Sequence, residues 1–132
     1  ELSFDYYYFL NGIRQYVAVG TKLKHENTSD PQFDYQLRQF RIRYQYRMTL
    51  LNLPAQVDLG WRYQRREYDE ARTSSINDFR LDKRNHFDAG IEFRLQQRLT
   101  AAVETEYRKN SSNLPAADYI ERIYTIGLRY QF

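Results

Sequence analysis

Apolar and polar residues alternate one by one through most of this chain, and no other feature restricts its fold as strongly. The segment AQVDLGWRYQ at 55–64 is typical, with apolar residues at odd positions and polar residues or glycine at even positions. The same period recurs at 40–48, 87–95, 99–108 and 124–132. Successive side chains of a β-strand point to opposite faces, whereas a helix groups residues about three or four apart. The pattern predicts an all-β protein whose strands have one apolar and one polar face.

The predicted strands are joined by two kinds of connection that alternate along the chain. Seven strands are expected, at about 2–10, 13–26, 33–49, 55–69, 79–95, 99–109 and 118–132. Short connections at 11–12, 50–54 and 96–98 alternate with longer polar ones at 27–32, 71–78 and 110–118. The first is Asn-Gly, a strong signal for a two-residue hairpin. We expect one domain over residues 1–132, an antiparallel meander with tight turns at one end and longer loops at the other.

One strand breaks the alternation. In FDYQLRQFRIRY the apolar set runs through Phe33, Tyr35 and Leu37 and then changes phase to Phe40 and Ile42. An extra residue in one strand of a pair restores the phase of its side chains. The sequence therefore predicts a β-bulge near positions 38–39.

Composition excludes several classes of function. The 132 residues include no cysteine, which excludes disulfides, thiolate metal sites and a cysteine nucleophile. The net charge is only +3, and basic residues alternate with acidic ones, so no nucleic-acid-binding patch is expected. No cofactor and no metal-binding cluster are expected either.

The alternation fits both a soluble barrel or sandwich, with the apolar face inside, and a transmembrane barrel, with the apolar face toward lipid. The 13 tyrosines favour the membrane, because their hydroxyl groups would need partners in a dry core but reach water at an interface. Aromatic residues also recur eight positions from the tight-turn end of five strands, at Phe40, Tyr63, Phe87, Tyr107 and Tyr124. Eight residues of a tilted strand rise roughly 20 Å, close to the apolar band of about 25 Å in such barrels.

The last nine residues, YTIGLRYQF, end in Phe132 and carry apolar side chains at alternate positions. They resemble the C-terminal strand of Gram-negative outer-membrane β-barrel proteins. The resemblance implies an antiparallel up-and-down transmembrane β-barrel in the outer membrane, surrounded by lipid and lipopolysaccharide. It also implies an assembly signal read by the barrel-assembly machinery, formed by Tyr124, Ile126, Leu128, Tyr130 and Phe132.

The longer stretch EYRKNSSN…DYIERIYTIGLRYQF also resembles the last hairpin of barrels that follow periplasmic helical-repeat domains, such as surface-lipoprotein assembly modifiers and exopolysaccharide exporters. This resemblance adds periplasmic domains or other subunits to the candidate partners. Bacterial barrels usually have an even number of strands, with tight turns on the periplasmic side. Counting seven strands back from Phe132 places Glu1 at the loop end. We therefore expect the C-terminal part of a larger, even-stranded barrel.

The polar faces of the predicted strands supply the candidate lumen-lining residues: Arg41, Arg43, Arg47, Asp58, Arg62, Arg66, Asp82, Arg84, His86, Asp88, Glu92, Arg94, Glu104, Glu106 and Arg129. Their arginines either line a passage for anionic material such as acidic sugars, or pair with the acidic residues and fill the lumen without a pore. The near balance of charge favours pairing.

The expected function is transport or export through the outer membrane without enzymatic activity. The alternative is a plugged structural or anchoring barrel whose surface loops bind partners. A third hypothesis, an enzyme, depends on His86, which shares a polar face with Asp82 and Asp88. Outer-membrane aspartyl-type proteases use a histidine near aspartates in the barrel mouth, but a place in a lumenal hydrogen-bond ladder explains His86 more simply.

Overall fold

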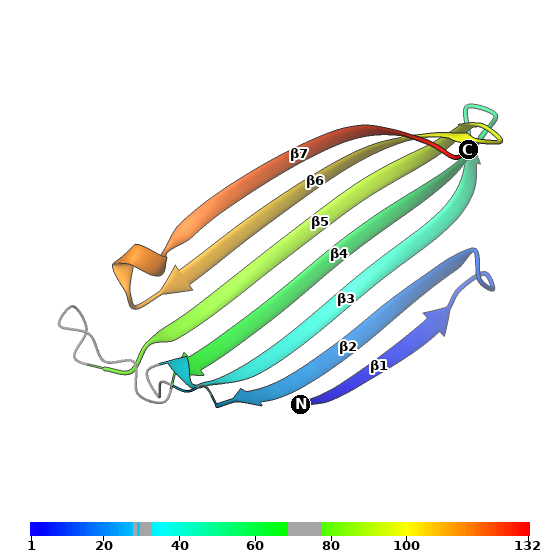
Figure 1. Cartoon of the computed structure of the whole chain (residues 1–132). Coiled ribbons are helices and arrows are strands. Elements are labelled where there is room, and N and C mark those ends of the chain that lie inside the picture. Colours follow the sequence, from blue (N-terminus) through cyan, green and yellow to red (C-terminus); the bar gives the residue numbers. More distant parts are fainter. Residues whose placement is uncertain (28, 30–32, 69–77) are drawn as a thin grey trace.

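The protein folds into a single curved sheet in which consecutive strands are neighbours. The computed structural model describes residues 1–27, 29, 33–68 and 78–132. The strands are β1 (Leu2–Phe9), β2 (Gln15–Glu26), β3 (Tyr35–Leu50), β4 (Leu53–Tyr68), β5 (Leu81–Gln96), β6 (Leu99–Ser112) and β7 (Tyr119–Tyr130), and a short 3-10 helix, η2 (Pro115–Ala117), precedes β7. Each strand pairs antiparallel with the next, in the order β1 to β7 (Figure 1). The predicted up-and-down meander is confirmed.

The tight turns gather at one end of the sheet and the longer connections at the other (Figure 1). Leu51 and Asn52 alone join β3 to β4, and their φ angles are 52° and 61°. Gly12, in the turn after β1, has a φ of 53°. Two-residue hairpin turns need such left-handed residues because their twist then matches that of the strands. The predicted two-residue Asn-Gly hairpin is wrong, because residues 10–14 join β1 to β2 and only Gly12 of the pair is left-handed. In the turn from β3 to β4, Leu51 adopts a conformation that costs a branched side chain energy.

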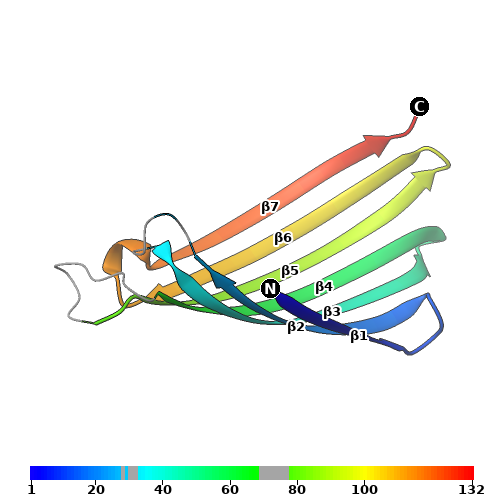
Figure 2. The same cartoon turned by 60° about the horizontal axis from the view of Figure 1, so that its bottom comes forward.

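The sheet curls into a trough but does not close (Figure 2). Among the described residues, β1 pairs only with β2 and β7 only with β6, so each leaves one edge unpaired. Every residue of β1 is exposed, as is all of β7 except Ile123.

The cross-strand register sorts the side chains onto two faces of opposite character. All the candidate lumen-lining residues lie on one face, and the hollows of the sheet are lined mainly from this side, which we call the concave face. The other, outward face carries most of the exposed large apolar residues. In the described part of the chain, Leu37, Ala55 and Tyr68 are the only buried hydrophobic residues. The sheet therefore has almost no core of its own.

The predicted bulge at positions 38–39 is wrong. Pairing of β3 with both neighbours runs without interruption from Tyr35, so no extra residue restores the apolar phase. Tyr35 and Leu37 consequently lie on the concave face, where Leu37 is 6% exposed. A register shift occurs instead between Arg94 and Gln96, beside the tight turn from β5 to β6.

Candidate functional site

The concave face carries a bidentate ion pair that reaches across a strand. Asp5 on β1, Gly20 on β2 and Arg41 on β3 are in register. The Arg41 Nε and Nη2 atoms lie 3.2 Å and 2.5 Å from the two carboxylate oxygens of Asp5. A Cβ atom on Gly20 would lie 2.1 Å from Asp5 Oδ1 and 2.6 Å from Arg41 Nε. The glycine therefore leaves the space through which the two charged groups meet.

A second glycine makes room for a carboxylate two strands further along. Gly60 on β4 is opposite Arg43 on β3 and Asp88 on β5. The Asp88 carboxylate covers Gly60 so closely that a Cβ atom there would lie 2.3 Å from Asp88 Oδ2. A hollow of about 130 Å³ opens here, with Arg43 and Arg62 in its wall. Among the described residues, Arg43, Arg62 and Asp88 form no ion pair, so the wall of this hollow carries charges of both signs without ion-pair partners.

His86 belongs to a network of charged groups that spans β5, β6 and β7. Its Nε2 atom lies 3.2 Å from Glu106 Oε2, which also accepts a hydrogen bond of 2.5 Å from Arg108 Nη2. Arg108 Nη1 in turn lies 3.3 Å from Glu121 Oε2. The described contacts of His86 therefore lead across the strands to Glu106 and not along its own strand to an aspartate. These contacts form a hydrogen-bonded ladder across the strands, and its place in a lumen stays a prediction.

Near the loops, Asp82 is the most enclosed carboxylate of the concave face. It is 5% exposed and accepts hydrogen bonds from Arg80 Nε at 3.0 Å, Arg80 Nη2 at 2.7 Å and Ser112 Oγ at 2.6 Å. These bonds raise the pKa of the Arg80 guanidinium, which also lies 4.6 Å from the ring centre of Tyr68. Burial without a partner would be costly for such a carboxylate, so Arg80 and Ser112 stabilise its charge.

Arginine–aromatic contacts line the same end of the trough. Arg66 lies 5.2 Å from the ring centre of Tyr35, and the Tyr35 hydroxyl donates a hydrogen bond of 2.6 Å to Glu26. Arg84 lies 5.9 Å from the ring centre of Tyr119 on β7. Among the described residues, Arg66 and Arg84 thus contact aromatic rings and form no ion pair with a carboxylate.

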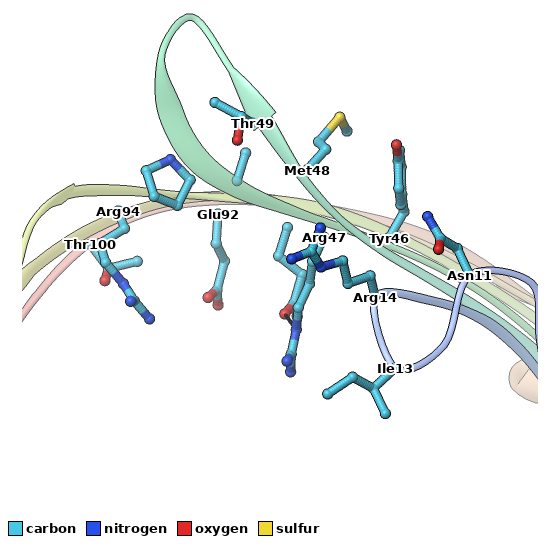
Figure 3. Close-up of a pocket in the computed structure, with 13 residues that line it drawn as sticks. Asn11, Ile13, Arg14, Tyr46, Arg47, Met48, Thr49, Glu92, Arg94 and Thr100 are labelled. Atoms are coloured by element: carbon cyan, nitrogen blue, oxygen red, sulfur yellow. Dashed lines mark hydrogen bonds between the residues drawn. The ribbon is translucent and has the colours of Figure 1, made fainter.

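The tight-turn end holds a larger hollow, of about 880 Å³. Figure 3 shows Glu92 and Arg94 pointing to the same side of the sheet there. Arg47 Nε donates a hydrogen bond of 3.0 Å to Gln56 Oε1, and Gln56 Nε2 donates one of 2.8 Å to Asp58. Arg47 and Asp58 are therefore linked through the side-chain amide of Gln56 and do not contact each other directly.

The remaining candidates lie close to β7. Glu104 and Arg129 line a hollow with Thr125 and Gly127, and Arg94 and Arg129 are opposite Thr100 on its two sides. Sequence reasoning missed Asp5, Arg80 and Arg108, which supply most of the ion pairs that the candidates make, and it missed Glu121, which pairs with Arg108. The sequence pattern places these residues on the polar faces of the strands, but only the strand register shows which residues they pair with.

The outward face carries a row of aromatic side chains across four strands. The ring centres of Phe40 and Trp61 are 5.8 Å apart, those of Trp61 and Phe87 6.2 Å, and those of Phe87 and Tyr107 6.2 Å. We call these four residues the aromatic row. Tyr63 is paired with Phe40, and the ring that contacts Phe40 and Phe87 is that of Trp61, two residues nearer the turns. Tyr124 is paired with Thr105, two residues nearer the turns than Tyr107.

The residues of the predicted assembly signal lie on the outward face of edge strand β7. Ile126 is 83% exposed, and Phe132 lies beyond the end of the strand at Tyr130. The rings of Tyr130 and Phe132 contact each other, with centres 5.2 Å apart.

Comparison with protein families, with curated proteins and with solved structures found no match. No helix in the described ranges is long and apolar enough to cross a membrane. Among the same residues, no group of three or more acidic or histidine side chains is placed to hold a metal ion.

Proposed function

We propose that this chain is part of the wall of an outer-membrane β-barrel that passes, or helps to export, anionic material without enzymatic activity. One observation carries the membrane part of the proposal: the outward face of β3–β7 has no charged residue between the aromatic row and the tight turns. The outward residues of this band are Ile42, Tyr44, Tyr46, Met48, Ala55, Val57, Leu59, Ala89, Ile91, Phe93, Leu99, Ala101, Val103, Thr105, Tyr124, Ile126, Leu128 and Tyr130.

The dimensions of this uncharged band support contact with lipid. Tyr107 and Leu99, at its two limits on β6, are eight residues apart. With a rise of about 3.3 Å per residue and a tilt of about 40°, they differ in height by roughly 20 Å. An aromatic row at the border of such a band suits the membrane interface, where ring faces meet acyl chains and polar ring atoms meet water.

Closure of the barrel needs strands beyond the seven described. β1 and β7 both run from the loop end to the tight-turn end, since they are the first and last of seven alternating strands. An antiparallel partner for each edge must run the opposite way, so an odd number of further strands has to lie between them. A closed barrel would then have an even number of strands, as bacterial barrels usually do.

The transport part of the proposal depends on arginines of the concave face. Arg43, Arg62, Arg94 and Arg129 form no ion pair with the residues described, and they follow the trough from its middle to its tight-turn end. Rings of basic side chains favour the passage of anions through a pore. The second candidate function, a plugged anchoring barrel, is favoured by the linked groups from His86 to Glu121, which occupy the trough with satisfied charges.

Conductance of the protein in planar lipid bilayers separates the two functions. A passage gives steady single-channel current with anion selectivity, and Arg43→Gln with Arg62→Gln lowers that selectivity. The control, Arg38→Gln with Lys83→Gln, removes the same charge from the outward face and leaves selectivity unchanged. Insertion without steady current identifies the plugged barrel, and failure to insert contradicts the membrane proposal itself.

A further inference from the structure

Among the described strand residues, the outward face carries charge only at its loop end, and this charge is almost entirely positive. Arg38 on β3 is directly opposite Arg65 on β4, which is directly opposite Lys83 on β5. Lys109 on β6 and Arg122 on β7 lie on the same face. We call these five residues the basic belt. Neighbouring strands are about 4.8 Å apart, so three cations in register occupy roughly 10 Å.

The basic belt runs beside the aromatic residues of the same strands. Arg38 precedes Phe40, Arg65 follows Tyr63, Lys109 follows Tyr107 and Arg122 precedes Tyr124, so each cation is two positions nearer the loops than the aromatic residue. On β5 the spacing is four positions, from Phe87 to Lys83. Five successive strands thus place a cation just beyond the border of the uncharged band.

Acidic partners for these cations are scarce. Glu67 Oε1 lies 2.7 Å from Arg65 Nε, and the Arg122 guanidinium lies 5.9 Å from the ring centre of Tyr107. Arg38, Lys83 and Lys109 are exposed and form no ion pair within the described part of the chain. The concave face differs, because its basic and acidic residues occur in nearly equal numbers.

Like charges directly opposite each other in a sheet are destabilising. An anion placed over Arg38, Arg65 and Lys83 would turn this repulsion into attraction, and phosphate accepts hydrogen bonds from guanidinium and ammonium groups alike. The height of the belt, just beyond the aromatic row, is that of lipid headgroups at a membrane interface.

We infer that the basic belt binds the phosphate groups of membrane lipids, in the leaflet at the loop end of the sheet. The inference rests on the proposed function, since it requires the uncharged band to lie in the bilayer. The roughly 10 Å between the outer two of the three cations in register favours a headgroup with more than one phosphate over a singly phosphorylated one.

The test compares lipids that differ only in phosphate. The protein is reconstituted into phosphatidylcholine nanodiscs that contain either bis-phosphorylated lipid A or its dephosphorylated form, and bound lipid is counted by native mass spectrometry after detergent extraction. We expect at least about tenfold greater retention of the phosphorylated lipid, as two or three charge-assisted hydrogen bonds provide. Millimolar inorganic phosphate should not displace it, because only the lipid is also held by its acyl chains.

Two triple variants locate the binding site. Arg38→Gln, Arg65→Gln and Lys83→Gln together should abolish the preference for phosphorylated lipid. Arg43→Gln, Arg62→Gln and Arg94→Gln together make the same charge change on the concave face and should keep it.

Several results would overturn the inference. Equal retention of both lipids, an unchanged preference in the outward variant, or full displacement by inorganic phosphate would each do so. If the outward variant does not fold, the comparison of lipids on the unmodified protein still decides. Retention of an acidic protein in place of lipid would identify another kind of partner and also contradict it. Insertion without a headgroup preference refutes only this inference, whereas failure to insert refutes the proposed function as well.

Discussion

Val103→Arg tests directly whether the outward face meets lipid. Val103 lies on β6 in the uncharged band, is 48% exposed, and is flanked in register by Ile91 and Ile126. It is four residues from Tyr107 in the aromatic row and four from Leu99 at the tight turn. With a rise of about 3.3 Å per residue and a tilt of about 40°, it lies roughly 10 Å from either limit, at the middle of the proposed bilayer core.

The expected cost follows from that depth. An arginine on the lipid face of a transmembrane barrel costs about 2–4 kcal/mol at the midplane and about 0–1 kcal/mol near the interfaces. If Val103 faced water, the same substitution at an exposed position would change the free energy of unfolding by no more than about 0.5 kcal/mol. The two environments therefore differ by several times the error of the measurement.

Guanidinium titration of the protein folded into lipid vesicles measures this cost, with the fluorescence of Trp61, the only tryptophan, as the signal. Ala102→Arg is the matched control, because Ala102 is adjacent in the chain and lines the concave face beside Glu104. We expect Val103→Arg to destabilise by about 2–4 kcal/mol and Ala102→Arg by less than about 1 kcal/mol. Equal effects of the two substitutions, or a larger effect of Ala102→Arg, would refute the assignment of the outward face to lipid.

Three further predictions concern stability in the same unfolding assay. Leu51→Asn should stabilise the protein by about 1 kcal/mol, because asparagine tolerates the left-handed conformation that leucine is forced to adopt there; a loss of stability would contradict this. Asp82→Asn should cost about 1.5–3 kcal/mol through its bonds to Arg80 and Ser112, and an effect below 0.5 kcal/mol would count against its enclosed position. Asp5→Asn should cost less than about 1 kcal/mol despite the bidentate geometry, since its ion pair with Arg41 is exposed to solvent, and a larger loss would mean that the trough excludes water.

The strands could be predicted from the sequence because period-two alternation is a local property. Predicted and observed strands agree within a few residues, and the tight turns alternate with the longer connections as expected. The failure at Tyr35 and Leu37 shows where local reasoning stops. Apolar residues there suggested a change of phase, but the strand continues without one and Leu37 is buried on the charged face. Burial depends on the curvature of the whole sheet, which no short segment encodes.

The contacts of the concave face depend on register, which alternation does not determine. Asp5 and Arg41 are 36 residues apart, and they meet only because Gly20 lies between them in the sheet. The sequence identified Arg41 as a lining residue but offered no means to select Asp5 among the acidic residues of the chain. Similarly, His86 was considered with the aspartates of its own strand, whereas its described partner, Glu106, is on β6.

Alternation by itself leaves open whether the apolar face meets a protein core or lipid, and the distribution of charge along each strand is what separates the two. A face covered by a second sheet would be expected to lose its charges over the whole contact, with no common border and no preferred sign beyond it. Here the charges of the outward face stop at an aromatic residue on most of the strands β3–β7, and each cation lies on the loop side of an aromatic residue of its own strand. A planar apolar layer bounded by anionic headgroups would account for all three features: it excludes charge, it favours aromatic rings at its surface, and its headgroups attract cations. Different strands would share these features because they cross the same layer. The common limit of charge along the strands, and not the alternation, therefore favours a membrane.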